Sequence, residues 1–181
     1  MGPVCVARPQ YERFNHGGDI ADYIITELTR TPQMVNETRE GGPVVEPAAA
    51  IFGPKVMVIN EMSGSGGDAL PWLFKKNHVG TLVGERTWGG LVGIGGYPQL
   101  IDGGSVTAPR WALYGTHGQW EVEDIGIAPD IEVAQDPELI RQGHDPQLEA
   151  AVAEALSQLQ QHPVPQFPVP AAPDKHQVLP Q

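Results

Sequence analysis

The 181-residue chain is 40% hydrophobic, which suits one domain with a hydrophobic core. Its formal net charge of −11 argues against nucleic acid and anionic membranes as partners. Cys5 is the only cysteine, which excludes internal disulfides and cysteine-rich zinc sites and leads us to expect a cytoplasmic protein. We expect no membrane span, because no apolar run approaches roughly 18 residues, and no signal peptide in residues 1–10.

The first 13 residues form an atypical start, in which Val4–Ala7 can supply a short edge strand. A glycine pair, Gly17 and Gly18, closes the loop that follows. Asp19 can then cap a helix by accepting hydrogen bonds from its free first-turn amides. The apolar residues of this helix form one stripe, and they are Ile20, Ala21, Ile24, Ile25 and Leu28. We expect this stripe to pack on a sheet.

Two short apolar runs predict neighbouring parallel strands. Residues 31–47 are polar and interrupted by glycine and proline, which indicates a surface excursion. Lys55–Asn60 and Gly80–Glu85 are apolar and rich in β-branched residues, as in strands buried on both faces. A helix between them, ending near Lys75 and Lys76, completes a βαβ unit with a right-handed crossover. Ligands bind beyond the carboxyl ends of such strands.

A glycine-lined corner joins the first of these strands to the helix. Gly64, Gly66 and Gly67 permit the positive φ angles and the close backbone approach that a sharp turn needs. Asp68 can cap the helix. Pro71 fits the first turn, where a missing amide costs little.

Ser65 lies in this corner, at the predicted N-terminus of the helix. Free amides and the positive end of the helix dipole favour a developing oxyanion there, which acyl transfer to a serine requires. The alternative interpretation is a glycine-rich connection whose serines only cap the helix, since such corners are common in α/β proteins.

The region after residue 88 is rich in glycine and predicts β-hairpins. Gly89–Gly96 lacks the Lys-Ser/Thr ending of a phosphate-binding loop, which argues against nucleotide binding. Three strands separated by turns at 102–104 and 115–118 are predicted, at Pro98–Ile101, Ser105–Tyr114 and Gln119–Val122. Three tryptophans are expected in core or cleft walls, since stacking on nucleic acid would need a basic patch; they are Trp88, Trp111 and Trp120.

The C-terminal region predicts one helix and a tail. Asp145 is a helix cap and Pro146 suits the first helical position. The predicted apolar stripe of this helix consists of Leu148, Val152, Ala155, Leu156 and Leu159. Residues 162–181 are rich in proline and predict a disordered, extended tail, either free or laid on a neighbouring surface.

Three segments, Asn60–Asp68, Gly84–Gly90 and Val122–Glu132, occur in an order and spacing that resemble the catalytic region of the tricorn proteases. More broadly they resemble the C-terminal processing peptidases, a family of tail-specific serine proteases. The resemblance covers residues 14–161. It implies a ClpP/crotonase-like α/β core that hydrolyses oligopeptides through a serine acyl-enzyme, works as a homo-oligomer and needs no cofactor or metal.

Carried over residue by residue, the resemblance makes Ser65 the nucleophile. The amide of Gly66, where tricorn-like chains carry Asp, becomes one oxyanion donor. The second donor comes from the glycine pair after an Arg-x-Asn motif, with Gly17 as the first choice and Gly18 as the alternative. Glu123 matches the acidic residue that orients the catalytic histidine through a second serine.

The general base is the missing part of this assignment. In the family, the histidine and the second serine lie in a segment upstream of the nucleophile, which would precede residue 1 here. We therefore expect an upstream segment or other subunits as partners. His16 is an alternative base, but we interpret it as a surface or structural residue. The same holds for the remaining histidines, which show no metal-ligand spacing and are His78, His117, His144, His162 and His176.

Two further questions stay open at the level of sequence. An acidic residue in the excursion is associated with a preference for basic side chains in the family, and the weak candidates are Glu37, Glu40 and Glu46. The chain can also be a non-catalytic binding or assembly remnant of the same fold. The remnant and the active peptidase differ only in whether a histidine reaches Ser65. A crotonase-like enzyme acting on acyl thioesters is a third, weaker alternative.

Overall fold

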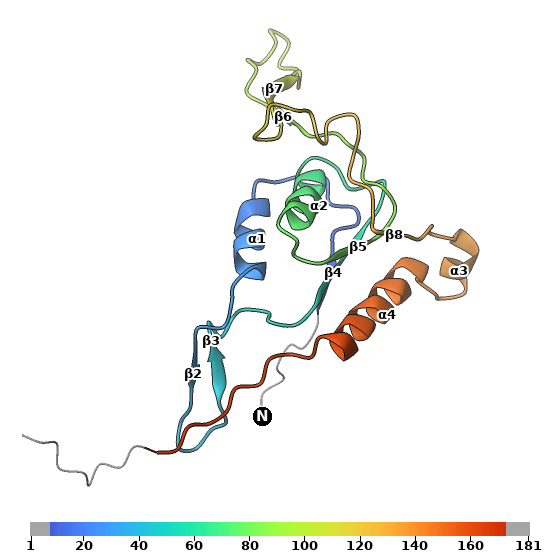
Figure 1. Cartoon of the computed structure of the whole chain (residues 1–181). Helices are drawn as coiled ribbons and strands as arrows, with labels where there is room; N and C mark the ends of the chain where they lie inside the picture. The colour runs from blue at the N-terminus through green and yellow to red at the C-terminus, as the bar shows by residue number, and fades with distance from the viewer. Residues whose placement is uncertain (1–7, 173–181) are drawn as a thin grey trace, which may run out of the picture.

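The computed structural model describes residues 8–172. Its centre is a four-stranded parallel sheet in the order β1-β4-β5-β8 (Figure 1). The strands are β1 (Arg8–Tyr11), β4 (Lys55–Ile59), β5 (Thr81–Gly84) and β8 (Ile131–Glu132). This confirms the α/β class and the predicted parallel pair. Strand β1 lies at one edge of the sheet, and the segment that we expected to form an edge strand, Val4–Ala7, lies outside the described residues.

The alternation of side chains along β4 explains why helices cover both faces of the sheet. Met57 and Ile59 point into one core, together with helices α1 (Ala21–Leu28) and α2 (Gly66–Lys76). Val56 and Val58 point into the other core, against helix α4 (Pro146–Gln161). Figure 1 shows the two layers on opposite sides of β4. Burial on both faces is what the apolar run of β4 predicted.

The cap of α1 and the apolar stripe of α4 differ from the sequence prediction. Ile20, not Asp19, precedes α1, and its side chain is 61% exposed. On α4, the predicted residues Leu148, Val152 and Leu156 are exposed. The buried residues of α4 are Gln147, Ala151 and Ala155, of which only Ala155 belongs to the predicted stripe. Small alanines let the helix approach the valines of β4 closely.

Several peripheral elements were mislocated or missed. Strand β6 (Val92–Ile94) lies inside the glycine-rich run and pairs with β7 (Pro109–Ala112), while the predicted strands at 98–101 and 119–122 do not form. The excursion carries a small antiparallel pair, β2 (Met34–Asn36) with β3 (Val44–Glu46). A short helix, α3 (Pro137–Arg141), precedes α4.

The ends of the described region add two observations. Residues 163–172 adopt neither helix nor strand, and within them only Val164 is half-buried. The disorder predicted for residues 162–181 stays a prediction. Within residues 8–172, no helix is both long enough and apolar enough to cross a bilayer.

A buried arginine ties the chain before the glycine pair to the start of α4. Arg13 donates to both carboxylate oxygens of Asp145, to Gln147 Oε1 at 3.0 Å and to the Tyr11 hydroxyl at 2.9 Å. Asp145 also accepts the Leu148 amide and thereby caps α4, as predicted. The hydrogen bond from Arg13 is the main cause that lowers the pKa of Asp145 from 3.8 to about 2.

This low pKa predicts a pH-dependent loss of stability. Because the folded-state pKa lies below the unfolded value, the stabilisation is present above pH 3.8 and disappears as the pH falls towards 2. We expect Asp145→Asn to lower the free energy of unfolding at pH 7 by roughly 1.5 kcal/mol, the lower end for hydrogen bonds to charged groups. Urea unfolding at pH 7 and at pH 2.5 measures this. An equal difference between variant and wild type at the two pH values contradicts it.

Candidate active site

Ser65 stands at the carboxyl end of β4, where the chain turns into α2. Its backbone has φ 55° and ψ −112°, a conformation that residues other than glycine rarely adopt. Asp68 accepts the Ser65 amide at 2.8 Å through Oδ2, the carboxylate half of a capping box. The side chain of Ser65 is half-buried at the helix N-terminus. The predicted strand-corner-helix arrangement is present, but α2 begins at Gly66, so its N-cap is Ser65 and not Asp68, and Pro71 lies inside the helix and not in its first turn. The positive φ of the corner is at Ser65 and not at the three glycines expected to adopt it.

The loop Glu12–Gly18, called here the N-terminal loop, is fastened to this corner by hydrogen bonds from several groups. The Gly64 amide donates to the Asn15 carbonyl at 2.9 Å. The Phe14 amide donates to Asn60 Oδ1 at 3.2 Å. The buried Ser63 hydroxyl donates to the Glu12 carbonyl at 3.1 Å. The position of the glycine pair is thus fixed relative to the corner.

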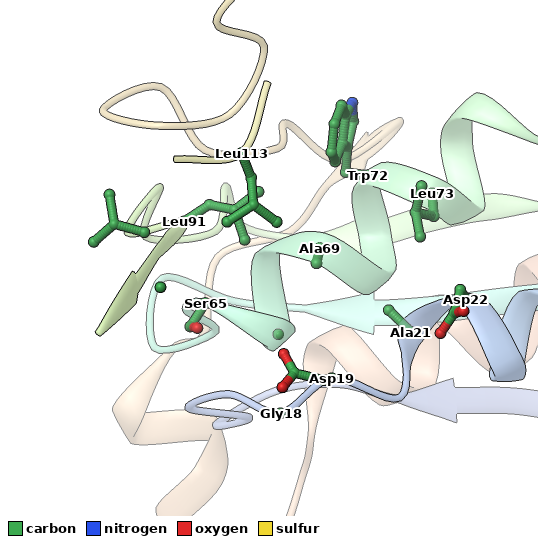
Figure 2. A pocket seen from close by; sticks show the side chains of 13 residues that line it. Gly18, Asp19, Ala21, Asp22, Ser65, Ala69, Trp72, Leu73, Leu91 and Leu113 are labelled. Carbon is green, nitrogen blue, oxygen red and sulfur yellow. The ribbon is translucent and has the colours of Figure 1, made fainter. Parts of the chain in front are cut away.

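The corner glycines allow the N-terminal loop to touch the first turn of α2. A Cβ on Gly66 would overlap the Gly18 carbonyl oxygen and lie 2.7 Å from the Gly18 nitrogen. A Cβ on Gly67 would overlap the Asn15 carbonyl in the same way. Both neighbours are backbone atoms that no side-chain rotation can move aside. Figure 2 shows Ser65 and Gly18 on the two adjoining segments.

The two amides that remain free beside Ser65 are those of Gly66 and Gly18. The amide of Gly17, the first-choice donor, points to Asn15 Oδ1 and donates to it at 3.0 Å. In the described part of the chain, neither the Gly18 nor the Gly66 amide has a hydrogen-bond partner. The arrangement therefore favours Gly18 over Gly17, although a Cβ on Gly17 would lie 3.5 Å from the Ser65 hydroxyl oxygen.

A hollow of about 240 Å³ opens next to Ser65, Gly66 and Gly18 (Figure 2). Its walls are mostly apolar and come from α2 and from the chain around β6 and β7; they include Ala69, Trp72, Leu73, Leu91 and Leu113. Two carboxylates, Asp19 and Asp22, also line it. Sequence reasoning treated Asp19 only as a cap and did not consider Asp22, because their distance from Ser65 depends on tertiary contacts.

Glu123 lies away from this hollow. With Trp120 and Asp124 it lines a second hollow of about 360 Å³. Its side chain is partly buried, and Oε2 is buried without a hydrogen-bond partner. An unpaired buried oxygen is costly, so it marks a place where a donor is missing. Ser65 and Glu123 do not share a hollow within residues 8–172.

The described histidines do not line either hollow. His16 is exposed on the N-terminal loop, and His144 is engaged with Glu149 at 3.0 Å. His176 lies outside the described residues. Across residues 8–172, no cluster of three or more histidine, cysteine or acidic residues has the geometry of a metal site.

The acidic candidates of the excursion do not reach the hollow beside Ser65. Glu37 and Glu40 are exposed between β2 and β3, and Glu46 accepts the Ala48 amide at 2.8 Å. A buried acid that sequence reasoning missed is Glu12, whose carbonyl and side chain both hold the N-terminal loop. Burial raises the pKa of Glu12.

Comparison with known proteins gives one family. The sequence model described as Peptidase family S41 matches residues 13–133. A tricorn protease of Thermoplasma volcanium is 36% identical over 84% of this chain, and a putative tricorn protease homolog 2 of Streptomyces coelicolor is 38% identical over 93%. A putative tricorn-like protease C-terminal subunit of Sulfurisphaera tokodaii is 38% identical over 82%. The chain spans only 15%, 14% and 17% of these three relatives.

Solved structures agree with this grouping. The crystal structure of the tricorn protease superimposes with a TM-score of 0.80 and 34% identity, over 85% of this chain and 15% of that one. The photosystem II D1 C-terminal processing protease, at 23% identity and a TM-score of 0.51, shares the fold over 83% of this chain and 39% of its own. The α/β core described above is therefore the core seen in these proteins.

The close backbone contact at Gly66 generates a stability prediction. We expect Gly66→Ala to cost roughly 1–3 kcal/mol of unfolding free energy, the usual cost of overpacking, because its Cβ meets the Gly18 backbone. Gly42→Ala is the matched control, since a Cβ there meets nothing within 4 Å. Urea unfolding of both variants tests the contact. A Gly66→Ala protein as stable as the Gly42→Ala control would show that the two segments do not touch.

Proposed function

We propose that this chain, which belongs to peptidase family S41, carries the nucleophile of a tricorn-like serine peptidase that hydrolyses oligopeptides. The observation that carries the proposal is Ser65 at the start of α2, beside two unoccupied amides and an open hollow. This arrangement can accept a peptide carbonyl and stabilise the charge that forms on it.

In the proposed mechanism, the Ser65 hydroxyl attacks the carbonyl carbon of the scissile peptide bond. The developing oxyanion is held by the amides of Gly66 and Gly18, and the positive end of the α2 dipole adds to this stabilisation. Loss of one such donor costs serine proteases about 100- to 1000-fold in turnover. The C–N bond then breaks, and the leaving amine takes up the proton that the base accepted from Ser65. The acyl group stays on Ser65 as an ester until water hydrolyses it.

A general base must take the proton of Ser65, and we propose that it comes from a segment or subunit other than residues 8–172. The unpaired Oε2 of Glu123 supports this, because it offers an acceptor to a hydroxyl or imidazole arriving from outside. The Sulfurisphaera tokodaii relative is named as a C-terminal subunit, which supports a separate polypeptide as one source. A homo-oligomer is part of the same proposal.

The hollow beside Ser65 supports a preference for long basic side chains. Its apolar walls suit the methylene stem of lysine or arginine, and Asp19 and Asp22 offer acceptors for the cationic end. We therefore propose that these two carboxylates, rather than Glu37, Glu40 or Glu46, bind the basic side chain of the substrate.

This preference predicts the effect of removing one carboxylate. In an active preparation, Asp22→Asn should lower kcat/KM for a peptide with lysine before the scissile bond by roughly tenfold or more. A matched leucine peptide should change less than about twofold, because it makes no use of the carboxylate. Equal losses for both peptides would contradict the assignment. Fluorogenic peptides that differ at this one residue provide the measurement.

Turnover with and without an added upstream segment tests the proposed function. We expect the purified chain alone to hydrolyse peptides negligibly, since loss of the base leaves only about 1000- to 10,000-fold catalysis over water. Labelling by a fluorophosphonate probe and peptide turnover should both appear when the chain is extended upstream, and both should vanish in Ser65→Ala.

Two outcomes would contradict this account. Robust turnover by the unextended chain that is lost in Ser65→Ala would show that a local histidine, His16 first, acts as the base. No labelling in either preparation would favour the non-catalytic binding module, which is also compatible with the absence of any described histidine from the lining of the two hollows.

A further inference from the structure

Asp68 is the most completely buried charged side chain at the corner, and it does more than cap α2. It has no exposed surface. Its carboxylate accepts three backbone amides: Ser65 at 2.8 Å, Gly89 at 2.8 Å and Gly90 at 3.1 Å. Helix capping accounts for the Ser65 bond only, because the other two donors lie 21 and 22 residues further along the chain.

The loop that holds these two donors is itself locked to the segment containing Glu123. The Asp124 amide donates to the Gly89 carbonyl at 2.8 Å. A Cβ on Gly89 would lie 2.5 Å from the Gly126 nitrogen, so the two backbones are in direct contact.

Thr87 adds a second attachment to the same segment. The Thr87 amide donates to the Ile127 carbonyl at 3.1 Å, and the Ile127 amide donates back to Thr87 Oγ1 at 2.8 Å. Thr87 is also buried. The loop 85–90 and the segment 122–127 therefore form one hydrogen-bonded unit.

These contacts make a continuous path from Ser65 to the residue beside Glu123. It runs from the Ser65 amide to the Asp68 carboxylate, from that carboxylate to the Gly89 amide, and from the Gly89 carbonyl to the Asp124 amide. Asp68 is the one side chain in this path, since every other link is backbone. A buried carboxylate needs such donors, because each replaces water that burial removes.

We propose that Asp68 is a positioning residue that holds Glu123 at a fixed place relative to Ser65. The proposal rests on the proposed function, in which Ser65 and Glu123 act in one catalytic site. The groups that connect them, including the general base, come from another segment. Ser65 and Glu123 line separate hollows. The same connecting groups can reach both residues only if the distance between Ser65 and Glu123 is constant. Asp68 supplies this constancy without contacting the substrate.

Asp68→Asn is the variant that tests the path, because it keeps the size of the side chain and removes one acceptor oxygen. The matched control is Asp136→Asn, which alters the carboxylate that caps α3 by accepting the Glu138 amide at 2.8 Å. The readout is amide hydrogen exchange by NMR on the chain itself, together with the carboxyl ¹³C resonance of Glu123. Thermal unfolding of both variants reports global stability.

We expect Asp68→Asn to speed exchange of the Gly89 and Asp124 amides about tenfold or more and to move the Glu123 carboxyl resonance. The amide of Leu82, in the sheet, should keep its protection. Asp136→Asn should leave all of these signals unchanged. Faster exchange at Ser65 alone, with Asp124 and Glu123 unaffected, would reduce Asp68 to a helix cap and overturn the proposal.

A measurement on the unaltered chain keeps the test decisive if Asp68→Asn does not fold. The Gly89, Gly90 and Asp124 amides should then exchange with one common protection factor, because a single opening releases all three. Exchange of Asp124 independently of the two glycines would overturn the proposal.

The kinetic consequence separates this inference from the proposed function. In the upstream-extended protein, Asp68→Asn should lower kcat by about 100-fold, the cost of a misplacement near 1 Å, and leave KM within about twofold. An extended protein with no turnover would count against the proposed function. The exchange data would still test whether hydrogen bonds connect Ser65 to Asp124 through Asp68. An unchanged kcat in an active protein would overturn the positioning role.

Discussion

The structure depends on a contact between two stretches of backbone that have no side chains between them. The N-terminal loop lies directly on the first turn of α2, because Gly66 and Gly67 present only Cα atoms to the carbonyls of Gly18 and Asn15. This contact brings two amides beside one serine. A side chain at either glycine would separate the segments and leave Ser65 with the helix amide alone.

The elements that the sequence predicted best are those whose signals are local. The apolar run of β4 and the Asp145-Pro146 start of α4 each specify their structure through residues adjacent in the chain. The face of α4 was mispredicted, because larger residues form an equally regular stripe beside the alanines. In the structure the alanines pack against the sheet. Gln147 is buried on the same face of α4, where Arg13, Glu85 and Val133 form hydrogen bonds with its side-chain amide.

The candidate site divides in the same way. Ser65 follows from local pattern, whereas the choice between Gly17 and Gly18 depends on how the Asn15 side chain turns. Asp22 lines the same hollow as Ser65 only because α1 packs against α2. Asp68 reads as a helix cap from sequence, since its two further donors lie in a distant loop. These contacts join residues that are distant in the sequence and arise from tertiary packing. Periodicity and motif spacing therefore do not predict them.

A crystal structure of the upstream-extended protein with a peptidyl boronate would show whether Ser65 and the two amides act together on one substrate carbonyl. We expect a covalent bond from boron to Ser65 Oγ, with one boronate oxygen about 2.7–3.1 Å from the amide nitrogens of both Gly66 and Gly18. We also expect a donor from the added segment on Glu123 Oε2. A boronate bound at another residue, or an adduct whose oxygens face away from these amides, would contradict the account.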